Sequence, residues 1–272
     1  ALNPEPVLAA LMASRLLSAA GVDQESLLSG ETKYAVAVAE IEAPYDITGM
    51  ATTATQTSVS GRKTAVYGGQ VADTFLVAAM LNGKPALFSV DAKEAQVVGY
   101  AMMDGGGAAE LLLDNTPATL LLADATSALQ DATNAGIVAL CAEAVGAMDV
   151  THATTVDYLK QRNQFRVPTG KFQVLQHRAV DMLTEIEQAR SITIKAAAEL
   201  DGPDATRTCA MAKNLIGRAA RLVAEEAIQM HGGIAMTWEY PVSHYGKRLV
   251  MLDHQLGDSD FHLKQVMKAY TP

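Results

Sequence analysis

The stretch QMHGGIAMTWEYP, from Gln229 to Pro241, follows a long helical pattern and contains the only tryptophan of the chain. One glycine is enough to end a helix, because glycine readily adopts the left-handed conformation of a C-terminal cap. A second adjacent glycine, and the aromatic and acidic run that precedes Pro241, are more than a helix stop requires. The stretch therefore indicates a corner between two helices with a role beyond ending the first.

Helical periodicity extends from this corner over residues 125–272. Separate helical patterns run over 126–164, 172–200 and 205–231, and a last helix is expected to start near Ser259. In two of them apolar residues recur three and four positions apart, as in helices that pack lengthwise. These stripes consist of Leu175, Ala179, Met182, Ile186, Ala189 and Thr193, and of Ala212, Leu215, Ile216, Ala219, Leu222, Val223 and Met230. The pattern predicts an up-down four-helix bundle.

Residues 33–124 have a different pattern, in which short runs with β-branched residues are separated by turn signals. The Asn-Gly pair in LNGKP, Leu81 to Pro85, fits the type I′ turn of a hairpin. The run DGGGAA, Asp104 to Ala109, is interpreted as a flexible turn between strands, with a phosphate cradle as the alternative. Several short strands at this spacing predict a small antiparallel β-barrel or sandwich.

Residues 1–32 contain two short helical patterns, the second ending at Gly30. They are too few for an independent domain, so we interpret them as the remnant of an N-terminal helical domain that is mostly absent. The sequence thus predicts an α+β fold in three parts. These are the helical remnant at 1–32, a β-barrel middle domain at 33–124 and a helical bundle at 125–272.

Composition excludes several classes of protein. The 272 residues include 21 basic and 30 acidic ones, and the net charge of −9 argues against a nucleic-acid partner. No apolar run reaches the roughly 18–20 residues that a membrane-spanning helix needs. The P-loop, Rossmann and nucleophile-elbow motifs are absent from the sequence.

Metal binding is not expected. The two cysteines, Cys141 and Cys209, have no metal-ligand spacing and are predicted to be buried free thiols. The cluster DHQLGDSDFH, which begins at Asp253, does not match a known ligand spacing. Within it, Asp258 or Ser259 is a candidate cap of the last helix.

A basic segment, KQRNQFRVPTGKFQVLQH, lies at the break between two helical patterns. An arginine at such a corner can bind a phosphate through two parallel hydrogen bonds, and Phe165 and Phe172 could flank a planar ring. A solvated basic loop is the alternative. The cations around the break are Lys160, Arg162, Arg166 and Lys171.

Several of these segments resemble motifs of the acyl-CoA dehydrogenase family. Residues 156–190 resemble the segment that begins the second helix of that family's C-terminal bundle, with its Arg-x-x-Phe-Gly motif and following glutamine. Residues 229–241 resemble the Gln-x-x-Gly-Gly-x-Gly signature, and SGRKTAVYGGQVADTFLV resembles the central β-domain. The segments occur in the family's order over the whole chain, so the resemblance implies the family's fold.

The resemblance implies FAD as the cofactor. Arg162 and Gln173 match positions that hold the FAD diphosphate and adenosine part, usually on the neighbouring subunit. Gln164 and Phe165 belong to the same motif and are assigned to cofactor binding with them. Arg166 stands where the family has glycine, so this chain departs from the motif there.

A second FAD contact is implied at the corner described first. Gln229, Gly232 and Gly233 match the family signature, in which glycine lets the backbone approach the phosphates. The last glycine of the signature is replaced by Ala235. Residues 39–46 match the strand and loop where the family places flavin and substrate contacts, but the family's side-chain pattern is poorly kept there.

The reaction implied by the resemblance is α,β-desaturation of an acyl-CoA thioester, with removal of the α-proton by a carboxylate and hydride transfer to flavin N5. Leu256 falls where the family usually has the catalytic glutamate, and Gly136 falls at the alternative position of the base. Neither side chain can accept a proton. Asp258 is our candidate replacement, with helix capping as its alternative role, and Asp260 and Glu143 are further candidates.

The missing glutamate leaves more than one function open. The first is an FAD-dependent acyl-CoA dehydrogenase with an acyl-CoA substrate and an electron-transfer flavoprotein-like acceptor. The second is a non-catalytic structural subunit of a heteromeric acyl-CoA dehydrogenase, and a flavin-dependent acyl oxidase or monooxygenase is a third. A homo- or hetero-oligomer, dimer or tetramer, is implied, in the bacterial cytoplasm or, for a eukaryotic protein, in the mitochondrial matrix.

Overall fold

The computed structural model describes residues 2–3 and 5–270. It consists of two compact units, one formed by Asn3–Gly136 and the other mainly by Ile137–Pro272. Helix α3 (Thr126–Gln161) begins in the first unit and continues into the second. The N-terminal helices α1 (Val7–Ala19) and α2 (Glu25–Leu28) belong to the same unit as the strands.

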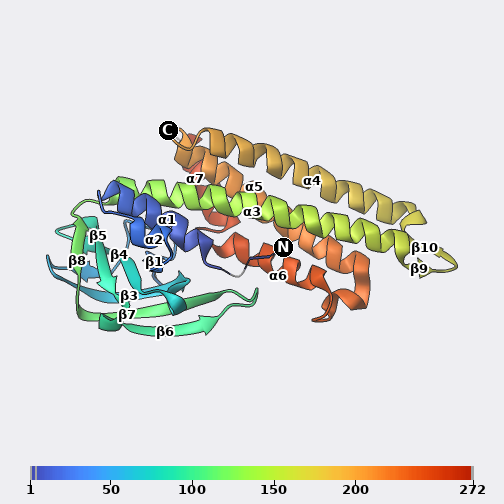
Figure 1. Ribbon diagram of the computed structural model, residues 1–272. Helices are drawn as coiled ribbons and strands as arrows, with labels where there is room; N and C mark the ends of the chain where they lie inside the picture. The colour runs from blue at the N-terminus through green and yellow to red at the C-terminus, as the bar shows by residue number, and fades with distance from the viewer. Residues whose placement is uncertain (1, 4, 271–272) are drawn as a thin grey trace. The chain divides into compact units, whose positions relative to one another are not determined.

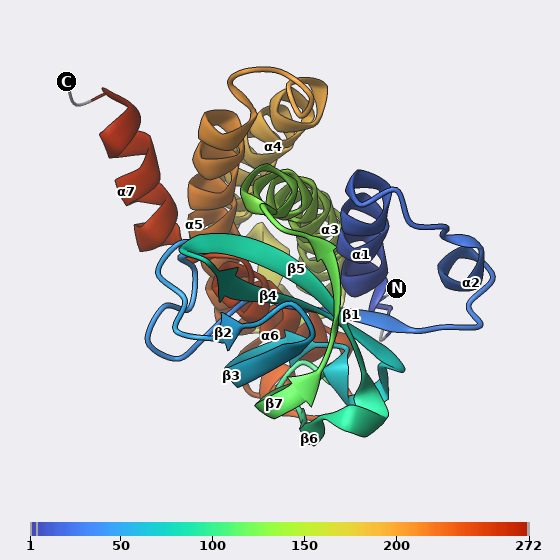
Figure 2. The ribbon, with the colours of Figure 1, turned by 90° about the vertical axis from the view of Figure 1, so that its left-hand side faces the viewer.

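The first unit is built around one eight-stranded sheet (Figure 2). Its strands are β1 (Tyr34–Ala37), β2 (Thr53–Ala54), β3 (Ser58–Tyr67), β4 (Thr74–Leu81), β5 (Lys84–Asp91), β6 (Gln96–Ala101), β7 (Gly107–Pro117) and β8 (Thr119–Leu122). Hydrogen-bonded neighbours follow the order β6-β7-β3-β2-β4-β5-β8, with β1 beside β4. A mixed α+β fold with a β middle region is therefore confirmed.

The pairing is not antiparallel throughout, which corrects the expectation from the sequence. Strands β1 and β2 both run parallel to β4. Parallel neighbours need a long connection, and the 36 residues between β1 and β4 (38–73) provide one. The predicted hairpin is confirmed, because Leu81 pairs with Lys84 and both Asn82 (φ 52°) and Gly83 (φ 83°) are left-handed, as a type I′ turn requires.

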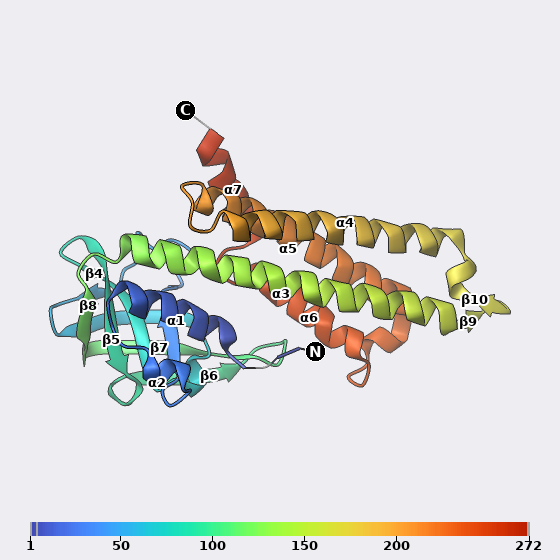
Figure 3. The same ribbon diagram turned by 45° about the horizontal axis from the view of Figure 1, so that its top comes forward.

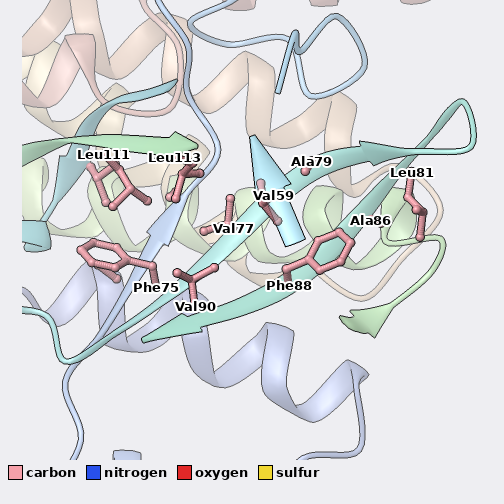
Figure 4. Close-up of a cluster of buried hydrophobic side chains, with 13 residues drawn as sticks. Val59, Phe75, Val77, Ala79, Leu81, Ala86, Phe88, Val90, Leu111 and Leu113 are labelled. Atoms are coloured by element: carbon pink, nitrogen blue, oxygen red, sulfur yellow. The ribbon is translucent and has the colours of Figure 1, made fainter. Parts of the chain in front are cut away.

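Strand β4 contributes to two hydrophobic clusters because successive side chains point to opposite faces of the sheet. Phe75 and Val77 pack with Phe88 and Leu111 in the cluster drawn in Figure 4. Leu76 points the other way, into a cluster that includes residues of α1 and of the first part of α3. Helix α1 therefore covers one face of the sheet (Figure 1).

The second unit is helical. Besides α3 it contains α4 (Gln173–Ala198), α5 (Ala205–His231), α6 (Pro241–His254) and α7 (Ser259–Tyr270). Helix α5 packs against α4, α6 and α7, and α4 runs lengthwise beside it (Figure 3). The apolar stripes account for this packing, since Met182 and Ile186 of α4 and Ala212, Ile216 and Val223 of α5 are buried.

One helix of the described residues, α3, is long and apolar enough to cross a membrane by length and composition. The helix meets this criterion as an average, because polar residues interrupt its apolar runs, and each run stays shorter than the roughly 18–20 residues considered from the sequence. More than half of the apolar window of α3 is buried inside the structure, as in the core helix of a helical bundle.

Candidate functional site

Two of the predicted ligand-binding segments lie at the same end of the helical unit. The β9–β10 hairpin (Asn163–Gln164 and Val167–Pro168) follows α3, and the corner between α5 and α6 lies at that end as well (Figure 1). The rings of Tyr158 on α3 and His231 on α5 stack with centroids 4.5 Å apart, and Tyr240, just before α6, lies 5.1 Å from His231. This aromatic cluster fixes the ends of α3 and α5 and the start of α6 together.

The hairpin projects an aromatic ring into solvent. Phe165 (φ 54°) and Arg166 (φ 69°) form its turn, and both are left-handed although neither is glycine. Backbone strain of this kind clusters at functional sites. The Phe165 side chain is 85% exposed and meets Phe172 edge-on, with ring centroids 6.1 Å apart. An exposed ring held at a strained turn can stack on a flat ligand.

The same hairpin carries cations without acidic partners. The segment from Tyr158 to Val180 contains no Asp or Glu. Arg162, Arg166 and Lys171 are exposed, and none of the three makes an ion pair within the described residues. Their donors are free for an anionic group, and a guanidinium suits the planar oxygens of a phosphate.

The α5–α6 corner exposes its backbone. Gly232 has φ 68° and ψ −146°, a conformation that only glycine adopts readily. A Cβ added at Gly232 or Gly233 would meet no atom within 4 Å, so a ligand can approach the backbone closely. Gln229 at this corner and Gln173 at the start of α4 are also exposed.

These residues fit the cofactor that the sequence implies. Free cations, an open glycine backbone and an exposed aromatic ring are the groups that a diphosphate with flat rings requires. The structure brings the exposed set to one end of the helical unit, and it consists of Arg162, Gln164, Phe165, Gln173, Gln229, Gly232 and Gly233. Their assignment to FAD binding stays a prediction.

His231, directly before the two glycines, is a buried residue of this corner that was not predicted from the sequence. Its Nδ1 donates a hydrogen bond to the Ala227 carbonyl (2.8 Å), while the buried Nε2 has no partner in the described part of the chain. Burial lowers the pKa of His231, so the ring is neutral at physiological pH. In the sequence, only its position directly before the two glycines indicated that it belongs to the corner.

The candidate base has a structural role. Asp258 precedes α7, and its Oδ1 accepts a hydrogen bond from the Phe261 backbone N–H (2.7 Å). That is the N-cap role considered for it from the sequence. Glu143 is bound on both oxygens by Arg248, at 2.6 and 2.8 Å, and Asp260 lies exposed in the first turn of α7. The catalytic assignment of Asp258 stays a prediction.

Two buried side chains that were not predicted from the sequence, Lys213 and His262, bind the loop that contains Leu256. Lys213 of α5 is fully buried, and its Nζ donates to the carbonyls of Asp253 (2.8 Å) and Gly257 (2.7 Å). His262 of α7 donates from Nε2 to the Leu256 carbonyl (2.9 Å). Burial lowers the pKa of Lys213 to about 8 and that of His262 to about 4. Leu256 itself is left-handed (φ 55°).

Two further expectations can be compared with the structure. Trp238, in the corner between α5 and α6, is 71% exposed, and its ring contacts Lys247 and His244 of α6. Cys141 and Cys209 are buried free thiols, as predicted. Among the described residues, no group of three or more His, Cys, Asp or Glu side chains is arranged to hold a metal ion.

Comparison with known proteins identifies a family. The family model for the acyl-CoA dehydrogenase C-terminal domain matches residues 126–271. Acyl-CoA dehydrogenase IpdE2 of Mycobacterium tuberculosis is 40% identical over 111 residues, which are 41% of this chain and 34% of that protein. The chain thus spans about a third of the length of the IpdE2 proteins that it matches.

Two solved structures share the fold over nearly the whole chain. The Tcur3481-Tcur3483 steroid ACAD G363A variant is 25% identical with a TM-score of 0.90, over 98% of this chain and 76% of that one. The ChsE4-ChsE5 complex from Mycobacterium tuberculosis is 23% identical with a TM-score of 0.88, over 99% of this chain and 77% of that one.

Proposed function

Since the chain belongs to the acyl-CoA dehydrogenase family, we propose that it acts as an FAD-dependent acyl-CoA dehydrogenase that desaturates an acyl-CoA thioester between Cα and Cβ. The observation that carries the proposal is the exposed set of groups at one end of the helical unit. The free guanidinium of Arg162, the ring of Phe165 and the open backbone of Gly232 are suited to a flavin dinucleotide.

Each group of this set has a separate part in binding. Arg162 neutralises a phosphate and donates two hydrogen bonds to it. The backbone at Gly232 and Gly233 would let the ligand approach closely, because these residues have no Cβ and the space beside them is open. Gln173 and Gln229 supply amide donors and acceptors for the polar edge of a nucleoside. Bound FAD supplies the acceptor for the hydride from Cβ.

Removal of the α-proton needs a carboxylate, and Asp258 is the proposed base. It lies two residues beyond Leu256, on the loop that Lys213 and His262 hold. Its Oδ1 caps α7, which leaves Oδ2 to accept a proton. The cap orients the carboxylate at the N-terminus of α7.

A non-catalytic subunit of a heteromeric acyl-CoA dehydrogenase is the second candidate. Leu256 cannot accept a proton, and both Asp258 and Glu143 are engaged in structural hydrogen bonds, which favours it. The steroid ACAD among the similar structures is named as a pair, Tcur3481-Tcur3483. An oligomer, an electron-transfer flavoprotein-like acceptor and a cytoplasmic location belong to the proposal with either candidate.

The two candidates are separated by flavin reduction. We expect the purified chain to carry FAD, and its absorbance near 450 nm to bleach when acyl-CoA is added without oxygen. Bleaching that Asp258→Asn abolishes and Asp260→Asn retains supports Asp258 as the base. If the chain binds FAD but acyl-CoA never bleaches it, and Leu256→Glu restores bleaching, the non-catalytic candidate is right. A chain that binds no FAD contradicts both the cofactor assignment and the proposed activity.

A further inference from the structure

A buried ion pair closes the neck of an exposed loop in the first unit. Residues 38–52 join β1 to β2 without helix or strand, and most side chains from Ile41 to Gly49 are exposed or half-buried. Glu40 is 2% exposed and Lys63 of β3 is fully buried, with Lys63 Nζ 2.6 Å from Glu40 Oε1. Two charges thus lie in the interior at the base of this loop.

The pair joins both ends of the loop. Glu40 at the incoming end accepts hydrogen bonds from the backbone N–H groups of Ala51 (2.6 Å) and Thr52 (3.1 Å) at the outgoing end. The Thr52 hydroxyl donates to the same carboxylate (2.6 Å). Lys63 also donates to the Val38 carbonyl (3.0 Å). Every one of these hydrogen bonds involves either the Glu40 carboxylate or the Lys63 ammonium group.

The neck leaves no room for other side chains. Gly61 of β3 lies directly against Thr52, because a Cβ at Gly61 would come within 2.6 Å of the Thr52 hydroxyl. Met50 is buried and its sulfur lies 3.9 Å from Lys63 Nζ. Loops whose ends are held together in this way form compact Ω-loops, which are frequently functional.

A buried ion pair is weak evidence of stability, because apolar residues of similar size often replace such a pair without loss. The hydrogen bonds here instead select one conformation of the loop neck. Above the neck the loop exposes Ile41, and the backbone N–H groups of Ile41, Glu42 and Ala43 have no acceptor within the described residues. An apolar surface beside free N–H donors suits a flat ring with carbonyl and ring-nitrogen acceptors, such as that of a flavin.

We infer that Glu40 and Lys63 are positioning residues that hold the loop Ile41–Met50 in the conformation in which it binds the flavin ring. The inference rests on the proposed function for its ligand. The contacts of Glu40 and Lys63 with both ends of the loop, here called the latch, exist in the chain without a ligand. The latch and its role in flavin binding can therefore be tested separately.

The latch is tested by hydrogen exchange of the protein without flavin. We expect Lys63→Met to raise the exchange rate of peptides covering 41–52 by about tenfold or more, because opening of the neck exposes the Ala51 and Thr52 amides. Lys84→Met is the matched control, since it removes an ion pair with Asp124 that is exposed on the same sheet, and it should leave the rate unchanged. Unchanged exchange in Lys63→Met overturns the latch.

If Lys63→Met does not fold, Glu40→Gln decides the question. It keeps one oxygen that can accept from Thr52, but it replaces the other oxygen, which accepts from Ala51, with an amide donor and removes the charge opposite Lys63. We expect faster hydrogen exchange in the same peptides of Glu40→Gln. An unchanged exchange rate would contradict the claim that Glu40 and Lys63 hold the two ends of the loop together.

The link to flavin is tested by titration of each variant with FAD, followed by flavin fluorescence. We expect about a tenfold weaker Kd for the latch variants and an unchanged Kd for Lys84→Met. Val77→Ala, a cavity variant in the core of the same sheet, controls for lost stability and should keep the Kd. Faster exchange with an unchanged Kd overturns the positioning role. A wild-type chain that binds no FAD overturns the proposed function and the flavin role together, and leaves the latch to the exchange test.

Discussion

The protonation of His262 makes the stability of the helical unit depend on pH. The ring is 3% exposed, its Nδ1 has no partner, and its Nε2–H binds the Leu256 carbonyl. Burial, the main cause, lowers the pKa from 6.5 to about 4. Between these values the unfolded chain binds a proton at this ring that the folded protein does not. Stability contributed by the neutral ring is therefore complete above pH 6.5 and is lost as the pH falls toward 4.

The size of the effect follows from the same two values. Each pH unit in the window contributes about 1.4 kcal/mol, so the ring accounts for roughly 3 kcal/mol between pH 6.5 and pH 4. Carboxylates titrate in the same range, so the wild-type slope alone is not diagnostic. The informative quantity is the difference between the wild type and His262→Gln, whose amide can still donate to Leu256 but does not titrate.

Urea denaturation at several pH values measures this difference. Trp238 is the only tryptophan and lies in the helical unit, so its fluorescence can be followed beside far-UV circular dichroism. The wild type should lose about 3 kcal/mol more than His262→Gln on going from pH 6.5 to pH 4. His177→Gln, at an exposed histidine, should behave like the wild type. Equal slopes in the wild type and His262→Gln would refute the reasoning.

Substitutions test three further features by the same denaturation assay: the cap of α7, the buried Lys213 and the turn at Gly83. Asp258→Ala should lower the free energy of unfolding by about 1 kcal/mol, because the cap of α7 is lost, and Asp258→Asn should lower it less. Lys213→Met should cost roughly 2 kcal/mol or more, since two buried carbonyl groups lose their donor, and a loss below about 0.5 kcal/mol would contradict this. Gly83→Ala should cost about 1 kcal/mol through its left-handed backbone, whereas Gly106→Ala, at a turn with negative φ, should cost less.

The helices were predictable because their apolar stripes are long. The pattern from Ala205 to His231 matches α5 residue for residue, and Ser259 begins α7 as expected. Strand β6 was not predicted, since five of its six residues are exposed and no apolar alternation marks it. The parallel pairing of β1 with β4 joins segments about 40 residues apart, and local sequence carries no signal of that register.

The candidate site was predictable only where a short motif carries it. The exposed glycines and the arginine of the basic segment could be located because each belongs to a motif of a few neighbouring residues, which can be found in the sequence alone. The contacts of Lys213 with Asp253 and Gly257 span about 40 residues, and those of Glu40 with Lys63 span about 20. A lysine in an amphipathic helix or a strand usually faces solvent, so neither buried cation was distinguishable from a surface residue before the fold was known.

The proposal that the helical corner holds FAD is tested most directly by titrating the purified chain and two charge variants with FAD. Arg162→Met should weaken binding by about tenfold or more, since a hydrogen bond to a charged group contributes roughly 1.5–3 kcal/mol. Lys160→Met removes a neighbouring cation that pairs with Asp157, and it should bind FAD like the wild type. Equal affinities of Arg162→Met and the wild type would contradict the account.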